Sequence, residues 1–388
     1  MKNQILINGL LVLLLLTNIN LAFAQTENTS DAIPQIYPGA IPSSPAFSLL
    51  GVNPEIVLRP SDIKEFKVDW RIKNYNLAPD LALEFQPLWW FYYRNKGLNA
   101  YRKVGPLGKI LSTTSISMAT AKVDNLNHIG YAIKWNLYKE KDPYLDETFQ
   151  KEFQQNRLEQ LAPIQEELDT LYRQMNRAVD GEEKIRISDL IIAKQFEIKA
   201  LEKQLMDDAQ TNGYRYIQEH WNMDMLDFSF GLVQKYDNGG LDSLKMRYAG
   251  FGLWINGAKG IGQRGLLTGL VRLNKIGENT DFLVGASYRY GSQKFNFFAE
   301  VARHRIGNNF QNGFNEEEVF AAKLDQDIGT GWYEFGDGES TTMTTLAFGG
   351  DFRLRYNILL NFALRTQLRK DVGFERFLPV ANVVCLMN

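Results

Sequence analysis

The sequence predicts an all-β transmembrane antiparallel barrel of about 10–12 strands with an inserted α-helical hairpin. Two observations predict the barrel. Apolar and polar residues alternate along many segments, and aromatic residues, including the stretch WWFYY at residues 89–93, gather at the ends of those segments. A third predicts the insertion, because the apolar spacing changes from two residues to about 3.6 after the first strands. In chain order, we expect a signal peptide (1–24), a Pro-rich arm (25–61), barrel strands (62–141), the helical hairpin (142–220) and further barrel strands (221–388).

Residues 1–24 have the features of a secretory signal peptide. Lys2 precedes a short apolar run, and Ala22 and Ala24 give the small-x-small pattern before Gln25. The sequence therefore predicts cleavage before Gln25 and a mature protein outside the cytoplasm. The only cysteine is Cys385, so we expect neither a lipoprotein anchor at the cleavage region nor an internal disulfide framework.

Residues 25–61 form an N-terminal arm that is rich in proline. This composition favours an extended or irregular chain, with one helical turn expected at the stretch AFSLLG. Three placements are open for the arm: it plugs the barrel lumen, lies beneath the barrel, or is a disordered leader.

The first strand signal is the stretch EFKVDWRIK, residues 65–73, in which Phe66, Val68 and Trp70 share an apolar face. Such segments are often about ten residues or longer, the length that a tilted strand needs to cross a bilayer, whereas ordinary strands have about five or six residues. The apolar face is therefore expected to contact lipid. A secreted β-sandwich is the alternative, because a half-buried strand shows the same alternation.

The opposite face of the strands is then expected to line the lumen. It carries charges of both signs, and the predicted lumen-facing residues are Lys67, Asp69, Arg71, Lys134, Arg289, Glu300 and Arg365. These charges can pair with one another and close the interior, or they can line a narrow polar pore. The sequence leaves both arrangements open.

Residues 142–220 show two apolar stripes at helical spacing on either side of Asp180-Gly181. We expect two helices whose stripes pack on each other like a short antiparallel coiled coil, with Pro163 in the first turn of the helix that it opens. The predicted partner-binding residues of this hairpin are Leu168, Leu171, Met175, Ile191, Ile198 and Leu201.

Residues 221–388 are expected to complete the barrel and to include a long loop, residues 307–340. Counting strands from the periplasm places the hairpin and the short turn at Gly291-Ser292 on the periplasmic side, and the long loop outside the cell. The stretch GIGQRG, residues 260–265, matches a dinucleotide-binding pattern, but a strand follows it, so a tight turn is expected instead.

No catalytic, cofactor or metal motif is found. The three histidines are scattered, and His128, on the predicted lumen face, is the least implausible catalytic candidate. Acidic residues in the long loop, such as Asp325 and Asp327, do not continue with calcium-loop spacing, so a solvated loop is expected there. The net charge of −2 is too balanced to suggest nucleic-acid binding.

The signal peptide, the arm sequence IPSSPAFSLLGVNPEIVLRPSD and the long alternating segments resemble outer-membrane β-barrel proteins of Gram-negative bacteria. The arm is similar to the N-termini of poorly characterised Bacteroidota-type barrels. The resemblance implies an outer-membrane location and brings no catalytic motif. The chain departs from the family in its last residues, VVCLMN, which lack the usual final aromatic residue and put the closing strand in doubt.

The functional prediction is an outer-membrane scaffold or narrow, porin-like channel whose hairpin docks a periplasmic or other envelope protein. The partners expected are therefore the lipid bilayer and this envelope protein, with no nucleic acid and no cofactor. The alternatives are a surface receptor or adhesin that uses loop 307–340, and a barrel hydrolase.

Overall fold

The structure is a computed structural model. It describes residues 41–50, 55–73, 76–123, 126–236, 246–276, 279–306, 341–369, 373–374 and 377–387. Loop 307–340, and with it the predicted acidic loop, lies outside the described residues, as does the predicted signal peptide.

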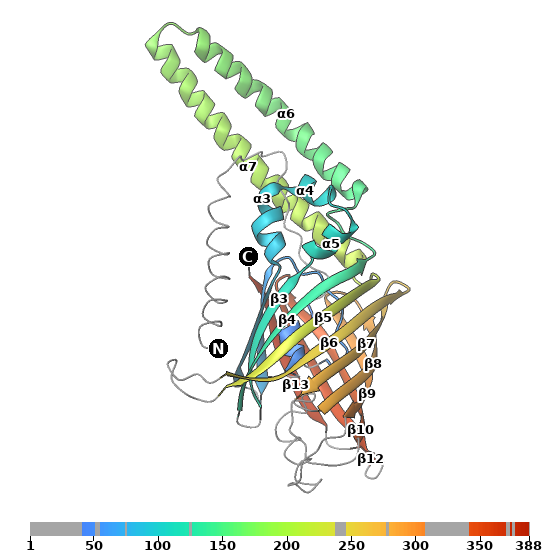
Figure 1. Cartoon of the computed structure of the whole chain (residues 1–388). Coiled ribbons are helices and arrows are strands. Elements are labelled where there is room, and N and C mark those ends of the chain that lie inside the picture. The colour runs from blue at the N-terminus through green and yellow to red at the C-terminus, as the bar shows by residue number, and fades with distance from the viewer. Residues whose placement is uncertain are drawn as a thin grey trace.

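Twelve strands form a closed antiparallel barrel (Figure 1). They are β1 (Phe66–Lys73), β2 (Asn76–Phe85), β3 (Ser115–Val123), β4 (Leu126–Lys139), β5 (Met225–Tyr236), β6 (Met246–Ile261), β7 (Gly265–Ile276), β8 (Asn279–Gly291), β9 (Phe295–Ile306), β10 (Thr341–Arg355), β11 (Ile358–Arg369) and β13 (Leu378–Met387). A short strand, β12 (Gly373–Phe374), pairs with the end of β11.

Each strand pairs with its neighbours along the chain, and the ring closes where β13 pairs with β1. In this last pair Val68 lies opposite Cys385, so the final segment supplies the closing strand that the sequence left in doubt. The predicted fold class is therefore confirmed, and the sandwich alternative is excluded because the sheet closes on itself.

The outer surface of the barrel is apolar, as the alternation predicts. Along β8, Phe282 and Val284 are exposed by 44% and 43%, whereas Leu283 between them is 2% exposed and points inward. The same pattern runs along β4, where Tyr131 is exposed and Gly130 and Ala132 are buried. Exposed apolar side chains on strand after strand make the continuous belt that a bilayer requires.

Exposed aromatic residues mark both rims of this belt. Tyr138, Tyr290 and Tyr356 lie at one end of the barrel, and Tyr248 and Phe282 near the other. Such girdles are typical of membrane–water interfaces.

The stretch WWFYY, predicted to be one of these strand-end aromatic groups, has a different structure. It forms a π-helix, η2 (Trp89–Tyr93), followed by three short helices, α3 (Arg94–Lys96), α4 (Leu98–Arg102) and α5 (Pro106–Ser112). These helices connect β2 to β3, and Trp89 and Tyr93 are buried among them. The aromatic cluster therefore belongs to a small helical layer over the barrel rim, which the sequence analysis missed.

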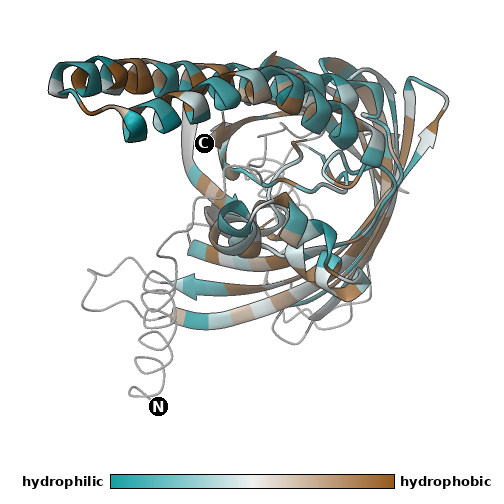
Figure 2. Cartoon of the chain, turned by 90° about the horizontal axis from the view of Figure 1, so that it is seen from above, coloured by the Kyte–Doolittle hydropathy of each residue, from teal (hydrophilic) through white to brown (hydrophobic). Residues whose placement is uncertain are grey.

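The insertion is a hairpin of two long helices, α6 (Glu147–Arg177) and α7 (Gly181–Glu219), which projects from the barrel (Figure 1) and extends beyond the ring of strands when seen from above (Figure 2). The predicted turn at Asp180-Gly181 is confirmed. The placement of Pro163 at a helix start was wrong, because α6 already begins at Glu147, with Asp146 as its N-cap. Pro163 lies at an exposed position in the middle of α6, where it removes one N–H from the hydrogen bonds of the helix.

The two ends of the barrel differ. The turns at residues 262–264, 292–294 and 356–357 lie at the end that also carries the helices, which we call the helical end. The strands that flank residues 307–340 meet at the opposite end. The hairpin thus shares its end with the Gly291-Ser292 turn, as strand counting predicted, whereas the side of the membrane on which this end lies stays a prediction. Among the described residues, no helix has the length and apolar character needed to cross a bilayer.

A charge on the belt should destabilise the barrel. Val271 lies at the middle of β7 and is 47% exposed on the outer face. We expect Val271→Arg to lower the free energy of unfolding in lipid vesicles by roughly 2–4 kcal/mol, because the guanidinium would sit near the bilayer midplane. Val271→Leu is the control, and equal effects of the two changes in denaturant unfolding would contradict the assignment of this face to lipid.

Candidate functional site: the filled lumen and the base of the hairpin

The lumen is filled by the N-terminal arm, which in the structure continues past residue 61 to Glu65, because β1 begins at Phe66. Residues 41–50 and 55–64 are buried, and they include the short helix α2 (Pro45–Leu49), seen inside the barrel in Figure 1. The helical turn expected at AFSLLG is therefore confirmed. Of the three placements open for the arm, the described residues take the first and plug the barrel.

Apolar side chains of the arm fit against small residues of the barrel wall. Phe47, Leu49 and Val57 are fully buried and form one cluster with the inward-facing residues Ala82, Ala119, Ala132, Val233, Ala249, Trp254 and Ala302. At Gly252 a Cβ atom would lie 2.5 Å from Leu49 Cδ1, and at Gly285 it would lie 2.6 Å from Val57 Cγ2. The wall therefore leaves room for the arm where a larger residue would collide with it.

Carboxylates of the wall accept hydrogen bonds from the backbone of the arm. The N–H of Ser44 donates to Asp69 (2.5 Å), and the N–H of Ser61 donates to Asp227 (2.8 Å). Glu300 accepts from two consecutive N–H groups, those of residues 56 (2.7 Å) and 57 (3.2 Å). An irregular chain in a dry lumen needs such partners, because its backbone groups have no strand to pair with.

Cations of the wall bind acceptors of the arm in return. Lys67 Nζ donates to the carbonyl of Pro42 (2.8 Å), and Lys134 Nζ donates to the hydroxyl of Ser61 (2.8 Å). Arg289 forms an ion pair with Glu55 of the arm. The arm is thus held by charged groups on several strands of the ring.

All seven residues predicted to face the lumen are buried inside the barrel, but they do not form a single site. Lys67 and Lys134 both form ion pairs with Glu84, and the Lys134–Glu84 distance is 3.0 Å.

Further ion pairs lie elsewhere in the lumen. Arg289 contacts Asp351 (3.1 Å), which also binds Arg59 of the arm. In the other pairings Arg71 contacts Asp80 (3.0 Å) and Asp69 lies 3.8 Å from Lys67, while Arg365 is buried on β11. Opposite charges pair locally around the arm, which is the closed arrangement of the two left open by the sequence.

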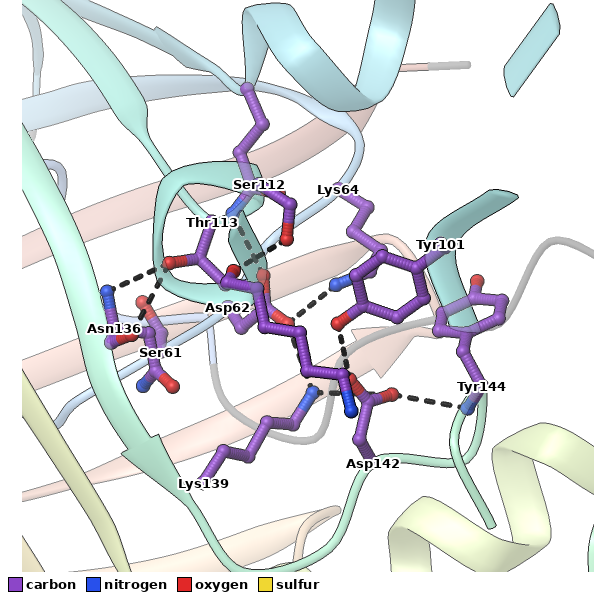
Figure 3. A network of polar contacts seen from close by, with 12 residues as sticks. Ser61, Asp62, Lys64, Tyr101, Ser112, Thr113, Asn136, Lys139, Asp142 and Tyr144 are labelled. Atoms are coloured by element: carbon purple, nitrogen blue, oxygen red, sulfur yellow. Dashed lines mark hydrogen bonds and ion pairs between the residues drawn. The ribbon is translucent and has the colours of Figure 1, made fainter. Parts of the chain in front are cut away.

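At the helical end, the arm meets the base of the hairpin through Asp62 (Figure 3). This carboxylate accepts from Lys64 (2.5 Å), Lys139 (3.0 Å) and Gln86 (2.8 Å). Burial by itself would raise the pKa of Asp62, but the ammonium groups of Lys139 and Lys64 hold that pKa well below its usual range. Asp62 is therefore ionised and bridges the arm to the end of β4.

Lys64 also lies in a cage of aromatic rings. Its ammonium is 4.5 Å from the ring centroid of Trp89, 5.4 Å from that of Tyr144 and 5.8 Å from that of Tyr101. Cation–π attraction stabilises an ammonium in such a position. Because Trp89 and Tyr101 come from the β2–β3 helices and Tyr144 precedes α6, the cage joins two separate parts of the chain around one side chain of the arm.

Both ends of the hairpin are fixed at this base. Before α6, Asp142 accepts from the hydroxyl of Tyr101 (2.9 Å), and the hydroxyl of Tyr216 on α7 donates to Asp146 (2.8 Å). After α7, the side-chain amide of Asn222 donates to the carbonyls of Gly262 and Gly265 in the β6–β7 turn, both at 2.8 Å. The Gly262 position has φ of +60°, as a tight turn requires, which confirms the turn expected for GIGQRG.

The predicted partner-binding residues lie in the seam between the two helices. Ile191 is 5% exposed, and Leu168, Leu171, Met175, Ile198 and Leu201 are half-buried. Contacts between the helices, including Arg157–Glu202 (3.3 Å), show that α6 and α7 cover each other there. The six side chains therefore lie where the two stripes pack on each other, and the binding of a partner through them stays a prediction.

A second apolar stripe on α7 was not identified from the sequence. Ile185, Ile192 and Phe196 are exposed by 66%, 47% and 68% and share one face at helical spacing. The buried seam residues of α7, such as Ile187 and Ile191, lie on the other side of the helix. The spacing of four and seven residues was readable in the sequence, but the stronger seam pattern masked it.

His128 is buried inside the barrel as expected, and the other two histidines do not join it. His220 contacts the ring of Tyr216 at the base of α7, while His304 pairs with Asp281. Within the part of the chain that the structure describes, no group of three or more potential ligands is placed to hold a metal ion.

No protein-family model matches the sequence, and the curated proteins give no match. Among solved structures, the chain is similar to OmpT (in-vitro folded), an outer membrane protein of Vibrio cholerae, at 5% sequence identity. The match covers 85% of this chain and 98% of that chain, with a TM-score of 0.24, which is too low to carry an argument. The assignment to outer-membrane β-barrels therefore rests on the closed ring of strands and its apolar outer belt.

The fit between arm and wall can be tested at Gly285. We expect Gly285→Ala to lower the free energy of unfolding by about 1–3 kcal/mol, because the new methyl group collides with Val57. In a Val57→Ala background, Gly285→Ala should lower the free energy of unfolding by a clearly smaller amount. Denaturant unfolding of the four variants in detergent gives the coupling free energy, and strict additivity would mean that the two residues do not touch.

The cage around Lys64 can also be tested by measuring the free energy of unfolding. Lys64→Met should lower the free energy of unfolding by roughly 1–3 kcal/mol, because Asp62 loses a buried partner and the rings lose their cation. Lys151→Met is the matched control, since Lys151 is exposed and pairs with the exposed Glu147. Limited proteolysis at the base of the hairpin should become faster in the Lys64→Met protein and stay unchanged in the Lys151→Met protein. Equal cleavage rates in the two variants would contradict the role of Lys64 in anchoring the hairpin.

Proposed function

We propose that the protein is an outer-membrane scaffold that holds a rigid helical hairpin in the periplasm for an envelope partner to bind. The proposal includes export with cleavage before Gln25 and placement of the helical end on the periplasmic side. The arm's likeness to Bacteroidota-type barrels belongs to the proposal as well and rests on its sequence alone.

The first support is that the hairpin is not needed to connect its flanking strands. Lys139 at the end of β4 pairs directly with Met225 at the start of β5, so a turn of a few residues would join them. The chain instead makes an excursion of 31 and 39 helical residues. At 1.5 Å per residue, these helices are about 46 Å and about 58 Å long.

The second support is the way in which the hairpin is mounted. Its base is tied to the barrel turns, to the β2–β3 helices and to the arm, so that the projecting part starts from a fixed platform. A loosely tethered pair of helices would not need buried ion pairs and an aromatic cage at its root.

The observation that carries the proposal is the exposed stripe of Ile185, Ile192 and Phe196. A hairpin in water needs one apolar face, which α6 and α7 already bury against each other. A second apolar face that is half to two-thirds exposed is typical of a surface that another protein covers. We therefore propose that the partner packs an apolar helix or groove against this stripe.

Site-specific photocrosslinking in cells tests the proposal. A photoreactive amino acid at Phe196 should give a discrete adduct with an envelope protein, and Ile192→Asp should reduce that adduct at least about tenfold by removing apolar contact. Position 197 is the matched control, because Glu197 is the next residue along α7 and points to a different side of the helix.

An adduct from Phe196 that disappears with Ile192→Asp, with none from position 197, would support docking on the stripe. Equal adducts from both positions, or none from Phe196 in a correctly assembled barrel, would contradict it. Labelling of a single cysteine at Gly181 in whole cells, with Cys385 replaced, would also place the hairpin at the cell surface and contradict the periplasmic side.

A further inference from the structure

We propose that the barrel wall encloses a latent ion-conducting pore and that the arm residues packed inside it, 41–50 and 55–61, are its removable gate. This function differs from the docking of a partner by the hairpin and does not depend on it. It rests on four properties of the lumen: a wall that closes without the arm, a bore left by small residues, a polar lining, and reversible contacts with the arm.

The wall closes without the arm. Each of the twelve strands pairs with two other strands, and none of the ladders includes a residue of the arm. Removing the arm would therefore leave the backbone hydrogen bonds of the ring intact. In this respect the arm differs from a core segment, whose loss would break the sheet that surrounds it.

The arm occupies a bore that the wall itself leaves open. Helix α2 lies against β2, β3, β4 and β5. The inward positions beside it are small, including Ala82, Ala119, Gly130, Ala132 and Gly231. A barrel of about eight strands can fill its interior with its own side chains, whereas these residues in a ring of twelve do not reach across. Without the arm, no protein atoms would occupy the space along β2–β5.

The emptied bore would be wet. Asp69, Asp227 and Glu300, which accept hydrogen bonds from the arm, would then lose those bonds and face the lumen. Two of them would keep partners on the wall, because Asp69 lies 3.8 Å from Lys67 and Asp227 accepts from Asn136 (2.7 Å). A lining of charged side chains attracts water and small hydrated ions. The solutes that fit this chemistry are inorganic ions rather than apolar molecules.

The contacts that hold the arm are of a kind that can be released. No cysteine lies within the arm, so no disulfide ties it to the wall. Phe47, Leu49 and Val57 are held by apolar burial, and the charged groups of the arm are held by ion pairs that water can replace. The arm therefore closes the bore at rest and leaves a conducting path when it is withdrawn.

Planar bilayer recording tests the proposal, with potassium chloride as the probe. The purified full-length protein should be almost silent. A variant that lacks residues 26–61 should show steady openings, with a mean conductance roughly tenfold or more above that of the intact protein. Heat-dependent migration on gels must show that both proteins form closed barrels. A folded variant that is as silent as the intact protein would overturn the proposal.

A second variant covers the case in which the shortened protein does not fold. Leu49→Asp places a carboxylate in the apolar contact between arm and wall and should raise the open fraction while the whole chain is kept. Leu158→Asp, at a site on α6 that is 69% exposed, is the matched control and should stay silent. Openings from both variants would point to general loosening and would count against a gate.

Locking the arm gives the converse result. The N–H of Ala46 donates to Ser117 Oγ at 3.0 Å, so cysteines at these two positions lie close enough for a short crosslinker, in a background with Cys385 replaced. In the Leu49→Asp protein, crosslinking should abolish the openings, and cleavage of the crosslink should restore them. Openings that persist in the crosslinked protein would overturn the proposal, because the path would then not run through the space held by the arm.

Discussion

The pairing of β1 with β13 is the interaction on which the rest of the structure depends. A strand edge in lipid would leave unpaired N–H and C=O groups in hydrocarbon, so the sheet must close. The register from Phe66 opposite Met387 to Ile72 opposite Ala381 achieves this closure. Once the ring is closed, its outside is assigned to lipid and its inside becomes a compartment in which charged side chains and an irregular arm can be buried together.

The buried charges specify the position of the arm more than they stabilise it. Taking an ion pair out of water costs about as much free energy as the pair returns, whereas a charge left without its partner is very unfavourable. Arg289 with Glu55, and Glu300 with two consecutive N–H groups of the arm, are satisfied only when the arm lies in one register. The contacts with small wall residues provide the apolar burial, and the charges select the place where it occurs.

The sequence was sufficient for the parts of the fold that follow a simple period. Alternation assigned Phe66 and Lys67 to opposite faces, and helical spacing found the hairpin and its turn at Asp180-Gly181. Prediction failed where the same sequence pattern can arise from two different structures. The aromatic stretch at Trp89 was assigned to the membrane interface but forms a helix, and Pro163 was taken as a helix start although an exposed helix interior tolerates it. The contacts of Lys64 join segments that are distant in the chain, and no local pattern encodes such proximity.

The location of the arm at one end of the chain has a consequence for the order in which the molecule forms. Its partners include Asp69 on β1, Glu300 on β9 and Asn382 on β13, the last of which contacts Ser43 across 339 residues of sequence. These partners stand together only after the final strand has been synthesised and has docked. The arm is made before every strand that holds it, so it must wait, without its native contacts, while the whole wall is built. The segment that leaves the ribosome ahead of the barrel is thus among the last to reach its native position.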